Sequence, residues 1–556
     1  MKKLVIFVLL KQFAAYLYTY KHRVLSLLIL CLFSLSFVDC AKRGRPSGGK
    51  RDSLPPVIVK STPENFSNNF EGNEIRIFFD EYIKLVDIQK NLVVSPPLEY
   101  QPIITPLTTS KQLRIKIQDT LRENTTYSFN FGKSIVDNNE SNEFPYYKYV
   151  FSTGSYIDSL TLSGKINDAL LPKAENPVSV LLYEYNERFS DSIVFKEKPS
   201  YITVTQDSSN TFQFTNLKEG KYLLLALKET NNDYIFQPKN DKIGFVRDTV
   251  SLPTDSTYSL KLFKEIADYK IARPTHVSKN EIQFGFDGNG DSLEISPISE
   301  VPADYNANIY RDFERDTLHY WFRPAFDSEV TDSLLFKVTN RATIDTVEVR
   351  LKNLFADSLK VTVASQSTLT PKDTFKLQAN TPIEAISSER IKIIDKDSVE
   401  VPHTFTLDKK YNRANIVFEK KFEQSYNIQV LPDAITDFFG ATNDTLRLKA
   451  RTKAADDYGE INLTLTNADQ FPLIVQLVNE KYNVIQSVSI DENIPVRFQY
   501  IDPGLYYIRV IFDTNQNGTW DPGNYLRNEQ PEKIKYYPAR LEVNGNWDLR
   551  EAFNLE

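Results

Sequence analysis

Four side chains with oxygen atoms that can ligate a metal stand at alternating positions near the end of this 556-residue chain: Asp513, Asn515, Asn517 and Asp521. Their spacing around Gly518 matches the ligand positions in the first three quarters of a calcium loop. Asn524 stands where a bidentate glutamate would complete the shell, so two carboxylates predict weak calcium binding, at about millimolar affinity. A glycine-centred loop closed by Asx turns uses the same residue types. The sequence leaves both alternatives open and predicts no other cofactor.

A second reactive position is Cys40, which follows an uncharged run from Val24 to Val38. Basic residues precede this run, which is shorter than the roughly 20 apolar residues that cross a bilayer, so residues 1–39 are predicted to be a lipoprotein signal peptide. We expect Cys40 to carry the lipid, whose acyl chains contribute about 0.8 kcal/mol per buried methylene. Asp39 stands where such cleavage sites have a small residue, so a retained N-terminal anchor is the alternative.

The sequence offers little for catalysis. Beyond residue 39 the histidines are His276, His319 and His403, too scattered to suggest a zinc site. The chain has no Gly-x-Ser-x-Gly elbow, no His-Glu-x-x-His and no glycine loop for phosphate. Only a pair of carboxylates assembled by the fold, as in glycosidases, remains open. We therefore expect no enzyme.

Charge and aromatic content limit the partners. The whole chain has a net charge of −7 and residues 1–39 contribute +4, so the chain from Cys40 carries −11, which argues against nucleic acid. The tryptophans, Trp321, Trp520 and Trp547, could stack on sugars, but most aromatics alternate with polar residues and are expected in cores.

The oxygen-rich turn Asp287–Asp291 is expected to be a hairpin loop.

Short runs of alternating apolar and polar residues position these groups. Examples are 75–79, 113–117, 127–131, 178–180, 359–363, 391–394 and 461–465. A period of two, bounded by Asn, Asp, Gly and Pro, predicts half-buried antiparallel strands, and no segment sustains a helical period. The sequence therefore predicts an all-β chain built of β-sandwiches.

Two internal repeats divide the chain. Residues 214–222 match 498–506 at an offset of 284, with a turn glycine before an inward tyrosine in both. This pattern resembles transthyretin-like or carboxypeptidase-regulatory-like sandwiches. A weaker repeat pairs 124–137 with 424–437 and resembles a bacterial immunoglobulin-like (Ig-like) module. A fifth sandwich, with strands around 282–284, 319–322 and 334–338, lies between the copies.

The predicted division follows from these repeats. It comprises a signal peptide (1–39), a flexible tether (40–56), a bacterial Ig-like domain (57–157), a transthyretin-like β-sandwich (158–266), a further β-sandwich (267–355), an Ig-like domain (356–454) and a second transthyretin-like β-sandwich (455–556). The tether is rich in glycine, proline and charge, a composition that would lift a domain off a membrane.

Several short segments in this order resemble a family of Bacteroidota outer-membrane lipoproteins that begin with an Ig-like domain of the surface-layer type. They lie at 40–56, at Phe151–Gly154, at 513–523, at 530–532 and at 546–547. The resemblance implies an outer-membrane lipoprotein without known catalysis. Lys42 and Arg43 have the wrong charge for the acidic export signal of surface lipoproteins, so the side of the membrane stays open.

From the sequence we therefore expect a non-catalytic, lipid-anchored cell-envelope scaffold or binding protein. Its five sandwiches would be strung as a rod or arc and would contact other envelope proteins. One version is an accessory subunit of an outer-membrane protein complex. A glycan-binding surface lipoprotein is the alternative, and an envelope hydrolase with clustered carboxylates is the third.

Overall fold

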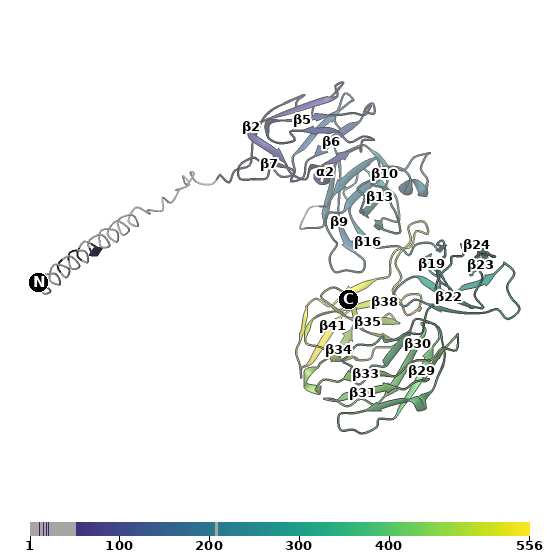
Figure 1. Cartoon of the computed structure of the whole chain (residues 1–556). Coiled ribbons are helices and arrows are strands. Elements are labelled where there is room, and N and C mark those ends of the chain that lie inside the picture. Colours follow the sequence, from purple (N-terminus) through teal and green to yellow (C-terminus); the bar gives the residue numbers. More distant parts are fainter. Residues whose placement is uncertain (1–10, 12–14, 16–17, 19, 22–51, 206–208) are drawn as a thin grey trace, which may run out of the picture.

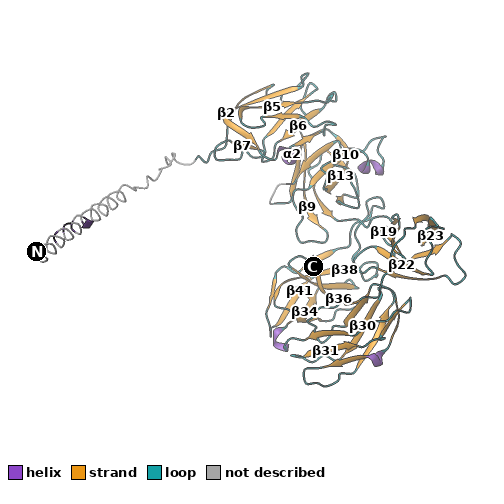
Figure 2. Cartoon of the chain, viewed as in Figure 1, coloured by secondary structure: helices purple, strands orange, loops and turns teal. Residues whose placement is uncertain are grey.

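Strands make up almost all of the ordered secondary structure (Figure 2). The computed structural model describes residues 11, 15, 18, 20–21, 52–205 and 209–556. Beyond residue 51 its helices are α2 (Ile88–Asn91) and three short 3-10 helices at Asp191–Phe195, Ser388–Arg390 and Ala455–Asp457. The predicted all-β class is confirmed. Within the described residues, no helix combines the length and apolarity needed to span a bilayer.

The sheets fall into five groups, which we call the first to fifth modules. The first module pairs two sheets, with strand orders β1-β2-β5-β4 (β7 also on β2) and β3-β6-β8. Its strands are β1 (Ile58–Thr62), β2 (Glu74–Leu85), β3 (Val93–Ser95), β4 (Ile103–Thr105), β5 (Ser110–Lys116), β6 (Thr126–Asn130), β7 (Ile135–Asp137) and β8 (Lys148–Ser152). The alternation of the sequence places Ile75, Ile77 and Phe79 in the core between them.

The second module has sheets β12-β9-β16 and β11-β10-β13-β14, with β15 also on β13. Its strands are β9 (Leu160–Asp168), β10 (Ser179–Glu184), β11 (Tyr201–Val204), β12 (Thr211–Leu217), β13 (Gly220–Lys228), β14 (Lys242–Phe245), β15 (Val250–Leu252) and β16 (Thr257–Leu262). Strand β16 runs parallel to β9, whereas the other pairs are antiparallel.

The fifth module repeats this topology strand for strand, as β37-β34-β41 and β36-β35-β38-β39 with β40 on β38, and β41 is again parallel to β34. Its strands are β34 (Gly459–Thr466), β35 (Leu473–Asn479), β36 (Val484–Ile490), β37 (Val496–Ile501), β38 (Gly504–Phe512), β39 (Ile534–Tyr536), β40 (Leu541–Val543) and β41 (Asp548–Asn554). The tyrosine hydroxyls of Tyr222 and Tyr506 donate to the carbonyls of Lys218 and Asp502, at 3.0 and 2.8 Å. The repeat at offset 284 is confirmed.

The third and fourth modules lie between the repeats in the sequence. The third has sheets β17-β19-β22-β21 (β18 on β19) and β20-β23-β24, and the fourth has β25-β26-β30-β29, β27-β32 and β28-β31-β33, close to the first module's order. Their strands are β17 (Lys270–Ile271), β18 (Thr275–Ser278), β19 (Glu281–Asp287), β20 (Leu293–Pro297), β21 (Asn306–Arg311), β22 (Thr317–Arg323), β23 (Ser333–Asn340), β24 (Thr343–Arg350), β25 (Val361–Val363), β26 (Phe375–Ala379), β27 (Ile383–Ile386), β28 (Ile391–Ile394), β29 (His403–Asp408), β30 (Arg413–Phe418), β31 (Ser425–Val430), β32 (Ile435–Asp437) and β33 (Leu446–Arg451).

The modules are not strung as a rod or arc, and that expectation is wrong. The chain doubles back, and the fifth module packs against the second, with a yellow loop of the fifth rising to it in Figure 1. Besides the core inside each module, the described residues form two apolar clusters between modules. The larger, which we call the shared apolar cluster, joins Val93 of the first module, the outer sheet face of the second and Tyr525 of the fifth. The smaller joins Tyr310 and Trp321 of the third module to Phe438 of the fourth. Alternation along single strands cannot report such a contact, because it forms between modules.

Candidate functional site

The lipidation site expected at Cys40 lies outside the described residues. The predicted calcium loop and the contacts beside it lie where the second and fifth modules meet. They are built by the loop between β38 and β39 and by the strand ends beside it.

The four residues of the predicted calcium loop do come together. Asp513 is buried, and its two carboxylate oxygens accept the backbone N–H groups of Asn517 and Gly518 at 3.1 and 2.8 Å. The side-chain amides of Asn515 and Asn517 both donate to the same oxygen of Asp521, at 2.6 Å each. Gly518 has φ 76°, the left-handed conformation that glycine adopts without strain.

A carboxylate that the sequence did not single out, Glu532, closes the loop. One of its oxygens accepts the N–H and the hydroxyl of Thr514 at 2.7 and 2.8 Å, and the other accepts the N–H of Asp521 at 3.1 Å. The calcium pattern predicts the last ligand at Asn524, whereas the carboxylate that closes the loop, Glu532, comes eleven residues after Asp521. The segment Gln530-Pro-Glu532 offered a signal only through the family resemblance.

The loop from Asp513 to Glu532 is held closed by its own hydrogen bonds. A calcium ion would need both asparagine amides turned so that their oxygens, not their nitrogens, face Asp521. Among the residues that the structure describes, no three His, Cys, Asp or Glu side chains gather closely enough to hold a metal ion. Both alternatives for Asp513, Asn515, Asn517 and Asp521, weak calcium binding and a loop closed by Asx turns, stay predictions.

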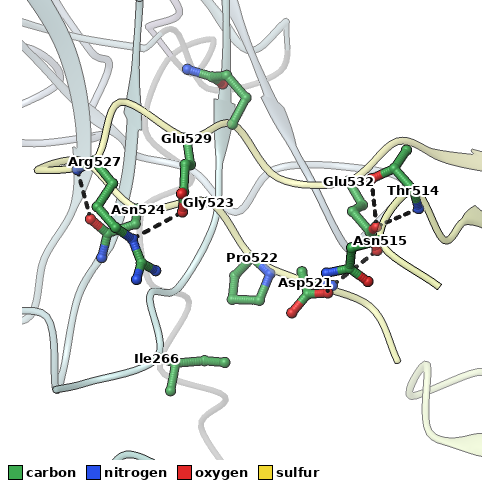
Figure 3. Close-up of a pocket in the computed structure, with 11 residues that line it drawn as sticks. Ile266, Thr514, Asn515, Asp521, Pro522, Gly523, Asn524, Arg527, Glu529 and Glu532 are labelled. Carbon is green, nitrogen blue, oxygen red and sulfur yellow. Dashed lines mark hydrogen bonds and ion pairs between the residues drawn. The ribbon is translucent and has the colours of Figure 1, made fainter. Parts of the chain in front are cut away.

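A cavity of about 420 Å³ opens beside this loop (Figure 3). Asn515, Asp521 and Glu532 line one end and the ion pair of Arg527 with Glu529 (3.0 Å) lines the other, while Ile266 of the segment after the second module approaches from a separate part of the chain. The polar side chains named here are already bonded to one another, so they leave no free group for a ligand. The cavity lies at the contact between the second and fifth modules, which we call the seam.

Tyr525 is the apolar anchor of this seam. It is 7% exposed, and its ring lies 5.4 Å from that of Phe245 and 6.2 Å from that of Phe195, both in the second module. Its backbone N–H donates to the buried carboxylate of Glu265, and burial raises the pKa of that carboxyl above its ordinary value. A methyl group on Gly523 would stand 2.3 Å from the backbone carbonyl oxygen of Glu529 and 2.7 Å from the ring of Phe263, so only glycine permits this close approach.

A polar contact fixes the other side of the seam. Arg509 is buried on the outer face of β38, where its Nε donates to the side-chain amide oxygen of Gln476 at 2.8 Å and its Nη1 donates to the backbone carbonyl of Leu170 at 3.3 Å. The hydroxyl of Tyr536 donates to the same Leu170 carbonyl at 2.7 Å. Two donors of the fifth module thus hold the turn after β9 in the second.

The corresponding loop of the second module has the same backbone. Glu229, which matches Asp513 at the repeat offset, accepts the N–H groups of Asp233 and Tyr234 at 2.9 and 2.8 Å. Tyr234 replaces Gly518 and still has φ 63°. The loop therefore lacks the glycine but keeps the left-handed turn, and Tyr234 packs against the shared apolar cluster.

Two other expectations need correction or extension. Asp287 and Asp291 do not flank a hairpin, since β19 and β20 belong to different sheets; the segment crosses between them, and Arg311 pairs with Asp291 at 2.8 Å. The fold places His319 between two acids distant in sequence, Glu281 at 2.6 Å and Asp312 at 3.3 Å.

The three tryptophans differ in environment. Trp321 is buried, and Trp520 is partly buried against the shared apolar cluster. Trp547 is 47% exposed. Packing thus accounts for two of them and leaves Trp547 partly exposed to solvent.

Comparisons with known proteins identify one part of the chain. Residues 52–153 match the family model described as a bacterial Ig-like domain, so the first module is such a domain. No curated protein matches the chain.

Similar solved structures include domains 1–6 of the surface layer protein SbsC (12% identity, 88% of this chain and 67% of that chain, TM-score 0.17). The major pilin subunit BcpA of Bacillus cereus is another (11%, 71% and 99%, TM-score 0.14). A third is the N-terminal eight Ig domains of Down syndrome cell adhesion molecule (11%, 88% and 70%, TM-score 0.15). At these TM-scores the likeness carries no argument about assembly or function.

Proposed function

We propose that this chain is a non-catalytic scaffold of a bacterial cell envelope, anchored to the outer membrane through a lipid on Cys40 and serving as an accessory subunit of an outer-membrane protein complex. The observation that carries the proposal is the buried seam between the second and fifth modules. A chain of sandwiches joined by such a seam holds its sheet faces and end loops at fixed positions, as a scaffold requires.

The anchor rests on the sequence around Cys40 and on the bacterial Ig-like domain that follows the tether. Mass spectrometry of the mature N-terminus tests it directly. We expect a diacylglyceryl cysteine at residue 40 and membrane retention, both lost in Cys40→Ala and kept in the matched Cys31→Ala. An intact Met1 on the purified protein would overturn the anchor.

The scaffold role is tested by chemical cross-linking in intact cells, followed by purification of the tagged full chain from detergent extracts. We expect a stoichiometric outer-membrane protein to be recovered with the wild type. Recovery of no partner above a tag-only control would count against the role even if Cys40 is acylated.

Glycan binding is the second candidate, favoured by the exposure of the Trp547 side chain. On a glycan array, binding that is lost in Trp547→Ala and kept in a phenylalanine variant at the same position would support it. Binding unchanged in Trp547→Ala would exclude this tryptophan as the platform.

A further inference from the structure

Strand β36 (Val484–Ile490) forms an open edge of the fifth module. It ends the order β36-β35-β38-β39, and within the described part of the chain β35 is its one hydrogen-bonded neighbour. An edge strand directs alternate N–H and C=O groups away from its sheet, where they can pair with another strand. Val484 and Ile485 on this strand are 45% and 46% exposed.

The composition of β36 is unusual for an edge. Its seven residues, Val-Ile-Gln-Ser-Val-Ser-Ile, include no charged residue and no proline, which are the usual protections of a free edge. Among edge strands of five or more residues in the described ranges, only β12 shares this property. Strand β12 is approached by the first module, since Lys148 donates to the Thr215 hydroxyl at 2.9 Å.

The repeat shows what an uncharged edge at this position does. The counterpart of β36 in the second module is β11, which ends the order β11-β10-β13-β14 and also lacks charge. The first module covers that edge: the N–H of Ile202 donates to the hydroxyl of Ser95 at 3.0 Å, and Val93 enters the shared apolar cluster. One copy of the edge is thus an occupied interface, whereas the other, β36, has no second strand beside it among the described residues.

We propose that β36 pairs antiparallel with β36 of a second copy of this chain, around a two-fold axis at Ser487. An uncharged strand pairs with itself without placing like charges opposite one another. The turn before the strand carries Glu480 beside Lys481 and is neutral overall, whereas two acids, Asp491 and Glu492, follow the strand. Antiparallel pairing brings Lys481 of one copy beside the acids of the other, and it joins the two sheets into one continuous sheet.

Cysteine cross-linking in the full chain tests both the pairing and its register. Opposite residues of an antiparallel pair have Cα atoms about 4.5–5.5 Å apart, within the range of a disulfide. Under oxidation we expect Ser487→Cys to give a covalent dimer, and Thr346→Cys, on the charged edge strand β24, to give none above the wild type. No dimer of Ser487→Cys, or a cross-link to another protein alone, would overturn the proposal.

A charge placed on the axis supplies the second measurement. Ser487→Lys sets two ammonium groups opposite each other, so light scattering should report twice the monomer mass for the wild type and the monomer mass for this variant. Thr346→Lys should remain a dimer. An unchanged circular dichroism spectrum and unfolding temperature of Ser487→Lys show that the fold is intact. A dimeric Ser487→Lys or a monomeric wild type would overturn the proposal.

Discussion

The second and fifth modules share one topology, yet their outer sheet faces are opposite in character. In the second module the paired positions on β10 and β13 are Leu181 and Leu225, whose side chains join an apolar cluster. In the fifth the corresponding positions on β35 and β38 are Gln476 and Arg509, which bond to each other and to the Leu170 carbonyl. The second module thus contributes an apolar sheet face to the seam, and the fifth contributes a polar one.

Their loops after the long strand show the same divergence on a shared backbone. Glu229 and Asp513 each accept two N–H groups, four and five residues further on. In the second module Tyr234 packs this loop against the shared apolar cluster. In the fifth module the loop is longer, and its Tyr525 packs against the second module. The two loops thus share the turn geometry while their side chains make different contacts.

The largest expected effect comes from removing the anchor of the seam. Tyr525→Ala should destabilise the contact by about 3–4 kcal/mol, because an aromatic side chain is lost from a packed cluster. Hydrogen exchange along β13 and β38 measures the effect. The adjacent Leu526→Ala, at a side chain 56% exposed, is the matched control and should change little; equal effects of the two variants would contradict the account.

Making the fifth module resemble the second tests the polar half. Arg509→Leu should cost about 1–3 kcal/mol, since it leaves the side-chain amide oxygen of Gln476 without its donor. The double variant Gln476→Leu with Arg509→Leu recreates the leucine pair of the second module and should be more stable than the single variant. Chemical denaturation measures both, and a double variant less stable than the single would refute the equivalence.

A pH dependence should distinguish the two loops. Burial raises the pKa of Glu229 from its ordinary 4.5 to about 7. The folded state then holds more protons than the unfolded state between these values, so the free energy of unfolding falls as pH rises through this window. Glu229→Gln should flatten this dependence in denaturation curves at a series of pH values. A slope unchanged in Glu229→Gln would show that the carboxyl is not its source.

Gly518→Ala should have a smaller effect, about 1 kcal/mol, from the left-handed backbone alone. No atom lies within 4 Å of the added methyl group, so no clash contributes. Thermal unfolding measures it. A loss comparable to that of Tyr525→Ala would mean that the loop, rather than the ring it carries, holds the seam.

The smallest expected effect is that of calcium. Since the loop is closed by its own hydrogen bonds, about 1 mM calcium, the affinity range of weak extracellular sites, should leave the unfolding temperature of the full chain unchanged. A rise that Asp513→Ala abolishes and Glu229→Gln does not would instead establish the site.

Much of the fold was predictable because local patterns determine it. The alternation at 75–79 and the glycine–tyrosine pair at 220–222 and 504–506 identify strands and repeats. The seam was not predicted, although Tyr222–Leu227 carried a signal: an unbroken apolar run means a strand buried on both faces. Glu532 could not be found by spacing, because it reaches the loop only through the turn that brings β39 back to β38.

The central claim, a fixed seam between modules far apart in sequence, is tested most directly by a distance between them. Spin labels at the exposed residues Glu187 and Glu480, in a chain with Cys31 and Cys40 changed to serine and diluted with unlabelled chain so that distances between copies do not contribute, report the separation of the second and fifth modules. We predict one narrow distance distribution that broadens in Tyr525→Ala. A broad distribution in the chain with Tyr525 intact would contradict the account.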